Sequence, residues 1–153
     1  MTARLSQKQK DYLNKARFAV LGTVNSEGQA HLVPIVFATV KNAIYFAIDA
    51  KQKKSTAGLR RIQNIKRTGK ATLLANDYRE NWSKLSHLIL YCGAVVLEDP
   101  DSLTERATAL EALKEKYSQY RGRNYLPDKE KAIFVKLTPQ RAIFWQNLHP
   151  SVP

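Results

Sequence analysis

The chain has 153 residues, of which 44% are hydrophobic and 25% are charged, so it can bury one sizeable core and is not of the disordered class. Its formal net charge of +12, from 25 Lys and Arg against 13 Asp and Glu, favours anionic partners such as phosphate groups, nucleic acid or acidic lipid. No apolar run is long enough to span a bilayer and the N-terminus is polar and basic, so we expect one cytoplasmic domain over residues 1–153 and no membrane partner.

Hydrophobic spacing predicts helices and strands in the following order along the chain: helix 6–16, strands 17–25, 29–40 and 43–49, helix 55–68, strands 70–77 and 85–98, helix 101–117, and strands 132–137 and 141–146.

Capping and turn residues mark the ends of these elements. Ser6 is a plausible N-cap of the first helix, and Ser55 or Thr56 can cap the second. Gly28 suits the tight turn between the first two strands, and Gly69 is placed to end the second helix. Residues 78–84 form a loop that carries a tryptophan.

Two residues indicate interruptions within strands. Pro34 lacks the amide donor that a ladder needs, so its strand is expected at a sheet edge or a bulge. Gly93 lies near the middle of a long strand and suggests a bend. About six or seven short strands at this spacing, with helices between them, are typical of an antiparallel barrel, closed or half-closed.

Basic residues concentrate between positions 51 and 70, where eight of the 25 Lys and Arg fall and no acidic residue occurs. Lys51, Lys53, Lys54 and Ser55 lie beside the predicted helix start, an arrangement that phosphate groups use. The alternative is a solvated basic helix face. The basic residues further along the helix are expected on that solvated face; they are Arg60, Arg61, Lys66 and Arg67.

Nucleic acid is a rival partner for the positive charge. Single-stranded nucleic acid is usually bound by basic residues interleaved with stacking aromatics, and residues 51–70 contain no aromatic side chain. Residues 117–125 do have that mixture, so this alternative stays open, although it is the weaker one.

The cysteine and the histidines do not suggest a metal or thiol centre. Cys92 is the only cysteine and lies in an apolar run, so we expect it to be buried and to form no intrachain disulfide. His31, His87 and His149 lack metal-ligand spacing, and we expect no metal.

Several segments together resemble the split-barrel flavoproteins typified by pyridoxamine 5'-phosphate oxidase, and within them the F420-dependent subgroup, which uses a deazaflavin. The segments are ARFAVLGTV (16–24), HLVPIVF (31–37), IYFAIDAKQKKS (44–55), LRRIQNI (59–65), ATLLANDYRENWSKL (71–85) and RAIFWQN (141–147). The resemblance implies a mainly β fold with peripheral helices, a homodimer, and FMN or F420 bound at the dimer interface.

The same resemblance implies the cofactor-binding residues. One strand runs along the ring and contacts it largely through backbone groups, a basic loop holds the phosphate, another loop closes over the cofactor, and a C-terminal tryptophan lies near the ring. In this order, the candidates are His31, Val33, Pro34 and Ile35; Lys51, Lys53, Lys54 and Ser55; Trp82 and Ser83; and Trp145. From the residues alone, His31 is nearly as well explained as a structural side chain, and Trp82 and Trp145 as packing.

The predicted function is hydride transfer between FMN or F420 and a small organic substrate. This chemistry resides in the ring, so no catalytic side chain is expected. True oxidases have an arginine where His31 falls, and their C-terminal arginine and histidine pair is not evident here, so we do not expect the vitamin as substrate. The alternatives are a non-catalytic cofactor carrier on the same fold and, with less support, a nucleic-acid-binding protein.

Overall fold

The computed structural model describes residues 2–48, 59–122, 125 and 132–148 of the chain. Among these residues, no helix is long and apolar enough to cross a membrane. The helices, 3-10 turns and strands follow the chain in this order: α1 (Gln7–Lys15), β1 (Ala19–Val24), β2 (Ala30–Ile35), β3 (Ala38–Val40), β4 (Ala43–Ile48), α2 (Arg60–Thr68), β5 (Lys70–Asp77), η2 (Trp82–Lys84), β6 (Ser86–Val96), η3 (Pro100–Ser102), α3 (Leu103–Lys116), η4 (Ser118–Arg121) and β7 (Ile133–Gln146).

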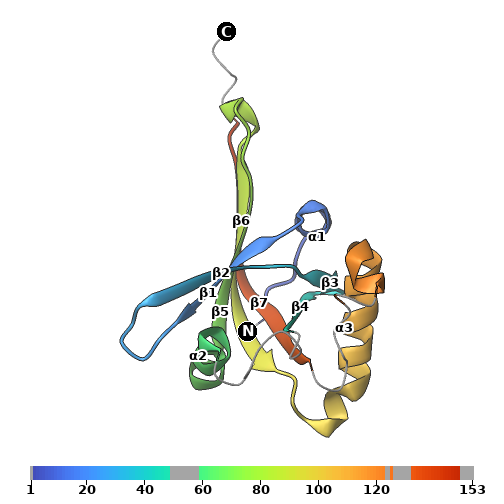
Figure 1. Ribbon diagram of the computed structural model, residues 1–153. Coiled ribbons are helices and arrows are strands. Elements are labelled where there is room, and N and C mark those ends of the chain that lie inside the picture. The colour runs from blue at the N-terminus through green and yellow to red at the C-terminus, as the bar shows by residue number, and fades with distance from the viewer. Residues whose placement is uncertain (1, 49–58, 123–124, 126–131, 149–153) are drawn as a thin grey trace.

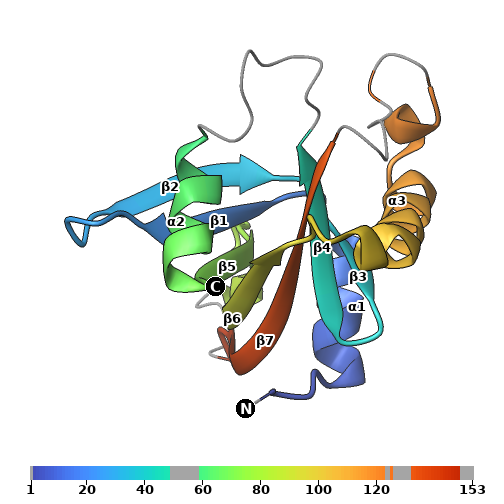
Figure 2. The same ribbon diagram turned by 90° about the horizontal axis from the view of Figure 1, so that it is seen from below.

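The strands form one antiparallel sheet in the order β2-β1-β5-β6-β7-β4-β3. The sheet curls into a half-barrel, with the helices at its periphery (Figures 1 and 2). The predicted fold class, a mainly β split barrel with helices, is therefore confirmed. The ends of β5, β6 and β7 continue past the rest of the sheet as a projecting arm, residues 77–87 and 144–148, which Figure 1 shows at the top.

Two apolar clusters stabilise the half-barrel. The larger cluster packs α1 and α2 against one face of the sheet, and its fully buried members include Leu13, Ile62, Leu73 and Leu88. The smaller cluster packs α3 against the opposite face at β3 and β4; its members include Tyr45, Ala109, Leu113 and Phe134. Both faces of the sheet are thus covered, but in different places.

The predicted caps and turns are confirmed where the structure describes them. The Ser6 hydroxyl accepts a hydrogen bond from the Gln9 amide at 3.1 Å, and the Gln9 side chain accepts one from the Ser6 amide at 2.9 Å. This reciprocal pair satisfies donors that the start of a helix leaves free. Gly28 and Gly69 have φ angles of 81° and 65°, which side chains rarely permit, and they close the β1–β2 turn and the end of α2.

The expected capping of the second helix by Ser55 or Thr56 is wrong. α2 begins at Arg60, and its N-cap is Leu59, which makes no side-chain capping bond. The helix therefore starts after the lysine-rich segment, and not beside it. Apolar spacing from Leu59 onward fixes the helix, because Ile62 and Ile65 are the side chains that it buries.

The predicted strand at 29–40 is two strands, β2 and β3, which pair at opposite ends of the sheet. They separate at Phe37, whose ring is fully buried and whose amide donates to the Tyr117 hydroxyl at 3.2 Å in place of a neighbouring strand. The chain thus crosses the open side of the half-barrel between Ile35 and Ala38.

The two predicted strands at 132–137 and 141–146 are one continuous strand, β7. The register with β6 shifts between Tyr91 and Cys92, and Gln140 is the extra residue of this bulge. A bulge interrupts the ladder, so Pro139, which has no amide donor, is accommodated there. The irregularity lies beside Gly93, where a Cβ atom would come within 3.1 Å of the Gln140 side chain.

Candidate functional site

β2 is an edge strand whose side chains alternate between the two faces of the sheet. His31, Val33 and Ile35 point to the face that carries the main core, and Ile35 is buried there. Leu32 and Pro34 point to the opposite face and are exposed. Within the described residues β2 pairs only with β1, so its other backbone edge has hydrogen-bonding groups available to a ligand, except at Pro34.

α2 is fixed beneath the β1–β2 hairpin by polar contacts (Figure 2). The buried amide of Asn64 donates to the Thr23 hydroxyl at 3.0 Å. The guanidinium of Arg67 donates to the carbonyl of Val24. In the register of the hairpin, Thr23 lies opposite His31, so α2 supports the part of β2 where the predicted cofactor strand begins.

Arg61 lies one helical turn before Asn64 and differs from the basic side chains around it. It is half-buried, and its Nε atom is buried without a hydrogen-bond partner. Removal from water lowers the pKa of its guanidinium. The expectation that Arg60 and Arg61 share a solvated face is therefore correct for exposed Arg60 and wrong for Arg61. Helical spacing was the available signal, because position 61 is on the same face as Asn64 and Ile65.

The rest of the basic segment is only partly described. Lys51, Lys53, Lys54 and Ser55, the predicted phosphate-binding residues, lie outside the described residues. Of the basic residues on α2 itself, Lys66 is exposed and pairs with Glu98 at 2.6 Å, and Arg67 is engaged with Val24. Among the described basic residues of α2, Arg61 is thus the one that is withdrawn from water without a recorded partner.

The arm carries the predicted aromatic residues. Trp82 is 65% exposed, and its carbonyl accepts a hydrogen bond from the Asn147 side chain at 2.8 Å. Ser83 is held by Asn81, whose side chain accepts from both the amide and the hydroxyl of Ser83. Trp145 stacks on His87 with ring centroids 5.2 Å apart. The arm therefore presents exposed, partly ordered aromatic rings.

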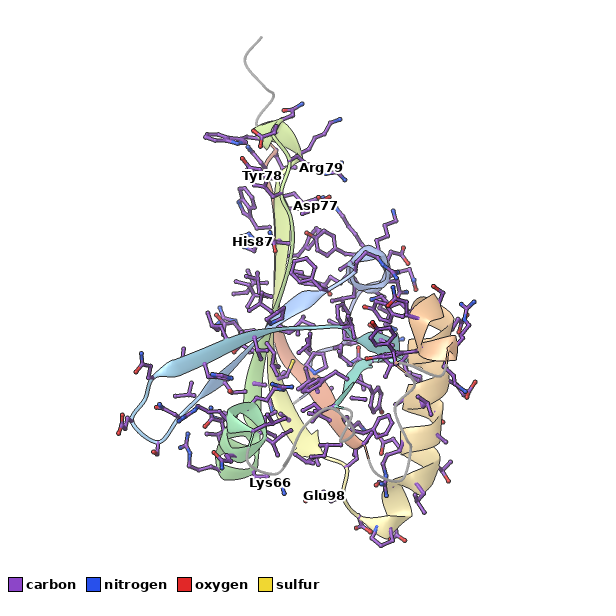
Figure 3. All side chains as sticks on the ribbon, in the orientation of Figure 1. Lys66, Asp77, Tyr78, Arg79, His87 and Glu98 are labelled. Atoms are coloured by element: carbon purple, nitrogen blue, oxygen red, sulfur yellow. The ribbon has the colours of Figure 1, made fainter. Side chains whose placement is uncertain are left out.

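The structure does not bring the arm and β2 together within one chain. Three strands, β1, β5 and β6, lie between β2 and β7. At about 4.8 Å per strand, this separation is roughly 19 Å. Figure 3 shows the arm residues Tyr78, Arg79 and His87 at the opposite end of the molecule from Lys66 and Glu98. The predicted cofactor residues thus form two separate groups.

An apolar surface connects the two groups across the sheet. Strand register aligns Pro34, Val20, Leu74, Ile89 and Ile143 in one row on the face opposite to α1 and α2. Next to this row, Leu32 is 67% exposed. The described helices pack elsewhere, α1 and α2 on the other face and α3 over β3 and β4. We call this surface the outer face.

Among the described residues, neither a reactive thiol nor a cluster of metal ligands accompanies these features. Cys92 is buried as expected, and burial raises the pKa of its thiol to about 12, so it stays protonated and unreactive. In the part of the chain that the structure describes, no three His, Cys, Asp or Glu side chains are grouped to hold a metal ion.

The family model described as pyridoxamine 5'-phosphate oxidase matches residues 5–146, almost the whole chain. The chain belongs to the pyridoxamine 5'-phosphate oxidase family. The family resemblance expected from the sequence segments is therefore confirmed. The chain has no match among curated proteins.

Solved structures with this half-barrel have varied ligands and low sequence identity. A conserved hypothetical protein from Mycobacterium tuberculosis has a TM-score of 0.74 at 19% identity, with 99% of this chain and 94% of that chain covered. An FAD-binding protein from Mesorhizobium loti has a TM-score of 0.66 at 12% identity, covering 93% and 95%. A heme storage protein from Vibrio cholerae has a TM-score of 0.66 at 14% identity, covering 94% and 95%. At these identities the likeness shows the fold alone.

Proposed function

We propose that this member of the pyridoxamine 5'-phosphate oxidase family binds FMN or F420 along β2 and uses it for hydride transfer with a small organic substrate. The family match and the FAD-binding neighbour support a flavin-type ligand. The available backbone edge of β2 suits a ligand that is recognised through main-chain groups.

The observation that carries the proposal is the half-buried guanidinium of Arg61, whose buried Nε atom has no hydrogen-bond partner. A cation that is partly removed from water without a counterion is unfavourable, so an anion that binds beside it is strongly favoured. The phosphate of FMN or F420 has this chemistry. Arg61 also follows the lysine-rich segment in the chain, so Lys51, Lys53 and Lys54 remain the proposed further phosphate ligands.

We further propose that the protein is a homodimer with the cofactor at its interface. Within one chain, β2 and the strand that carries Trp145, β7, are four strand spacings apart, or roughly 19 Å along the sheet. A second copy that packs on the outer face would cover its apolar row and bring one arm to the other chain's β2. The two groups of predicted residues, including Ser83 and His31, would then share one site.

When bound, such a cofactor supplies two-electron hydride chemistry, and the protein supplies position and water exclusion. The side chains of this chain fit that division of labour. Cys92 is held protonated in the core, and the arm offers Trp82 and Trp145 as rings to cover a planar ligand.

The test is a titration of the purified protein with FMN and, separately, with F420, followed by ring fluorescence. We expect Arg61→Met to weaken binding of the true cofactor by about ten- to a hundredfold, because a charged hydrogen bond contributes about 1.5–3 kcal/mol. Arg60→Met is the matched control, since Arg60 is exposed whereas Arg61 is half-buried. The Arg60→Met substitution should change the affinity for the cofactor by less than about twofold.

Other outcomes would refute the proposal or part of it. If neither FMN nor F420 binds, or if the two arginine variants behave alike, the Arg61 site is wrong. Tight binding without turnover of the reduced cofactor, across a panel of small organic acceptors, would favour the carrier alternative. A stoichiometric haem absorption band on addition of hemin, with no flavin binding, would place the protein with its heme-storing neighbour.

A further inference from the structure

The tyrosine-rich segment after α3, which the proposed function does not use, forms one wall of a cavity. The cavity measures about 460 Å³, within the usual range for small-molecule sites. It is lined by residues 117–120 and Tyr125, together with Arg17 and Val36. Its walls therefore combine three phenol rings, one aliphatic side chain and one guanidinium.

Hydrogen bonds fix this cavity to the end of β2. The Tyr117 hydroxyl accepts from the Phe37 amide at 3.2 Å and donates to the Arg17 carbonyl at 3.0 Å. Val36 directly follows the last residue of β2, Ile35. The cavity thus begins where the proposed cofactor strand ends, and two of its rings, Tyr117 and Tyr120, pack against the smaller core cluster.

Two cations share the ring of Tyr117. The Arg17 guanidinium lies 4.7 Å from the ring centroid and donates to the Lys116 carbonyl at 3.1 Å. The Lys116 ammonium lies 5.5 Å from the same centroid and donates to the Leu13 carbonyl at 2.9 Å. Burial, with a contribution from the charge of Arg17, lowers the pKa of Lys116 to about 8.

No carboxylate compensates this pair in the described ranges of the chain. Neither Arg17 nor Lys116 takes part in a salt bridge there. Asp77 lines a neighbouring cavity with Arg17, but its carboxylate is bidentately bound by Arg79, at 2.8 and 3.1 Å. A negatively charged group in the tyrosine-lined cavity would therefore meet positive charge that no carboxylate of the described residues compensates.

We propose that this cavity is a substrate site for a planar aromatic anion, such as an aromatic carboxylate, with Arg17 facing the charge and the tyrosine rings facing the ring system. Its identity as the substrate site rests on the proposed function, because only a cofactor ring along β2 makes the adjoining cavity a place for reaction. The binding itself does not depend on a cofactor.

The probes are 2-naphthoate and 2-naphthamide, which share a ring system and differ in charge. Calorimetric titration of the full chain without cofactor should show that naphthoate binds about five- to tenfold more tightly than the amide. Arg17→Met should abolish this preference and leave amide binding unchanged. Tyr125→Ala should weaken both ligands, because it removes a stacking surface and no charge.

Lys15→Met is the control for general electrostatics, since Lys15 is an exposed cation that lines two other cavities and not the tyrosine-lined one. It should keep the preference for naphthoate. The proposal is overturned if the wild-type protein does not distinguish the two probes, or if Lys15→Met and Arg17→Met lose the preference equally. A competition experiment tests the nucleic-acid alternative. If a single-stranded oligonucleotide binds more tightly than naphthoate and displaces it from the protein, the proposal is overturned in favour of nucleic acid.

A cofactor titration of Arg17→Met separates the two proposals. Suppose that Arg17→Met binds FMN or F420 like the wild type, and that neither protein prefers naphthoate over naphthamide. The cavity proposal then fails and the cofactor proposal stands. If the cofactor binds to neither protein while naphthoate still depends on Arg17, the cavity is a ligand site and the proposed function fails.

Discussion

The partly buried ammonium of Lys116 makes the stability of the protein depend on pH in a defined direction. Its pKa in the folded chain is about 8, below the ordinary value of 10.5, so the folded state binds fewer protons than the unfolded state between these two values. Stability therefore rises with pH across this window, and the full cost of the charged side chain is present below pH 8.

The size of the effect follows from the same pKa. A fall from 10.5 to about 8 corresponds to roughly 3.4 kcal/mol for a wholly buried group, at about 1.4 kcal/mol for each pH unit. The side chain is only partly withdrawn from water, so we halve this figure. More than half of this reduced destabilisation disappears by pH 9.5, because Lys116 in the folded chain loses its proton. The free energy of unfolding therefore rises by about 1 kcal/mol between pH 7 and pH 9.5.

The assay is urea unfolding of the wild type and of Lys116→Met at several pH values between 7 and 9.5. Methionine keeps most of the length and cannot titrate, so the free energy of unfolding of the wild type should rise by about 1 kcal/mol relative to the variant. Tyr45, Tyr117 and Cys92 have raised pKa values, which make stability fall as the pH rises. Both proteins contain these three groups, so their contributions cancel in the difference between the two free energies of unfolding. Parallel pH profiles for the two proteins would refute the reasoning.

Two further predictions concern the outer face and the support of β2. Ile89→Lys places a charge in the apolar row of the proposed dimer interface. In sedimentation we expect the wild type and the exposed-helix control Gln63→Lys to be dimers and Ile89→Lys to be a monomer. A dimeric Ile89→Lys, or a monomeric wild type, would contradict the proposed interface. Asn64→Leu leaves the buried Thr23 hydroxyl unpaired and should lower the free energy of unfolding by about 1–3 kcal/mol. Adding Thr23→Val should restore part of that loss, and a double variant as unstable as the single one would contradict the role of the bond.

Local signals in the sequence predicted most of the elements. Ser6 and Gln9 carry their cap within four residues, and Gly28 and Gly69 need only their own backbone angles. The fold class followed from the number of short strands and from the family segments. The caps and turns depend on residues that are close together in the chain, so they can be predicted from the sequence alone.

The predictions were wrong where the local structure depends on contacts with distant parts of the chain. The break at Phe37 depends on the Tyr117 hydroxyl eighty residues away, and the bulge at Gln140 depends on the register with β6. The burial of Arg61 depends on how α2 lies on the sheet, and charge counting placed it in water. The separation of β2 from Trp145 likewise depends on strand order, which sequence spacing does not encode.

The position of β7 in the sheet has a consequence for how the protein is made. β7 is the last strand in the described part of the chain, yet it lies between β6 and β4, and the β3–β4 hairpin joins the rest of the described sheet only through it. Until the ribosome has released residues 133–146, β4 and β6 both present unpaired edges, and the burial of Phe134 and Val135 cannot occur. Folding of the half-barrel is therefore expected to wait for β7, with the nascent chain dependent on protection from edge-to-edge association until that strand emerges.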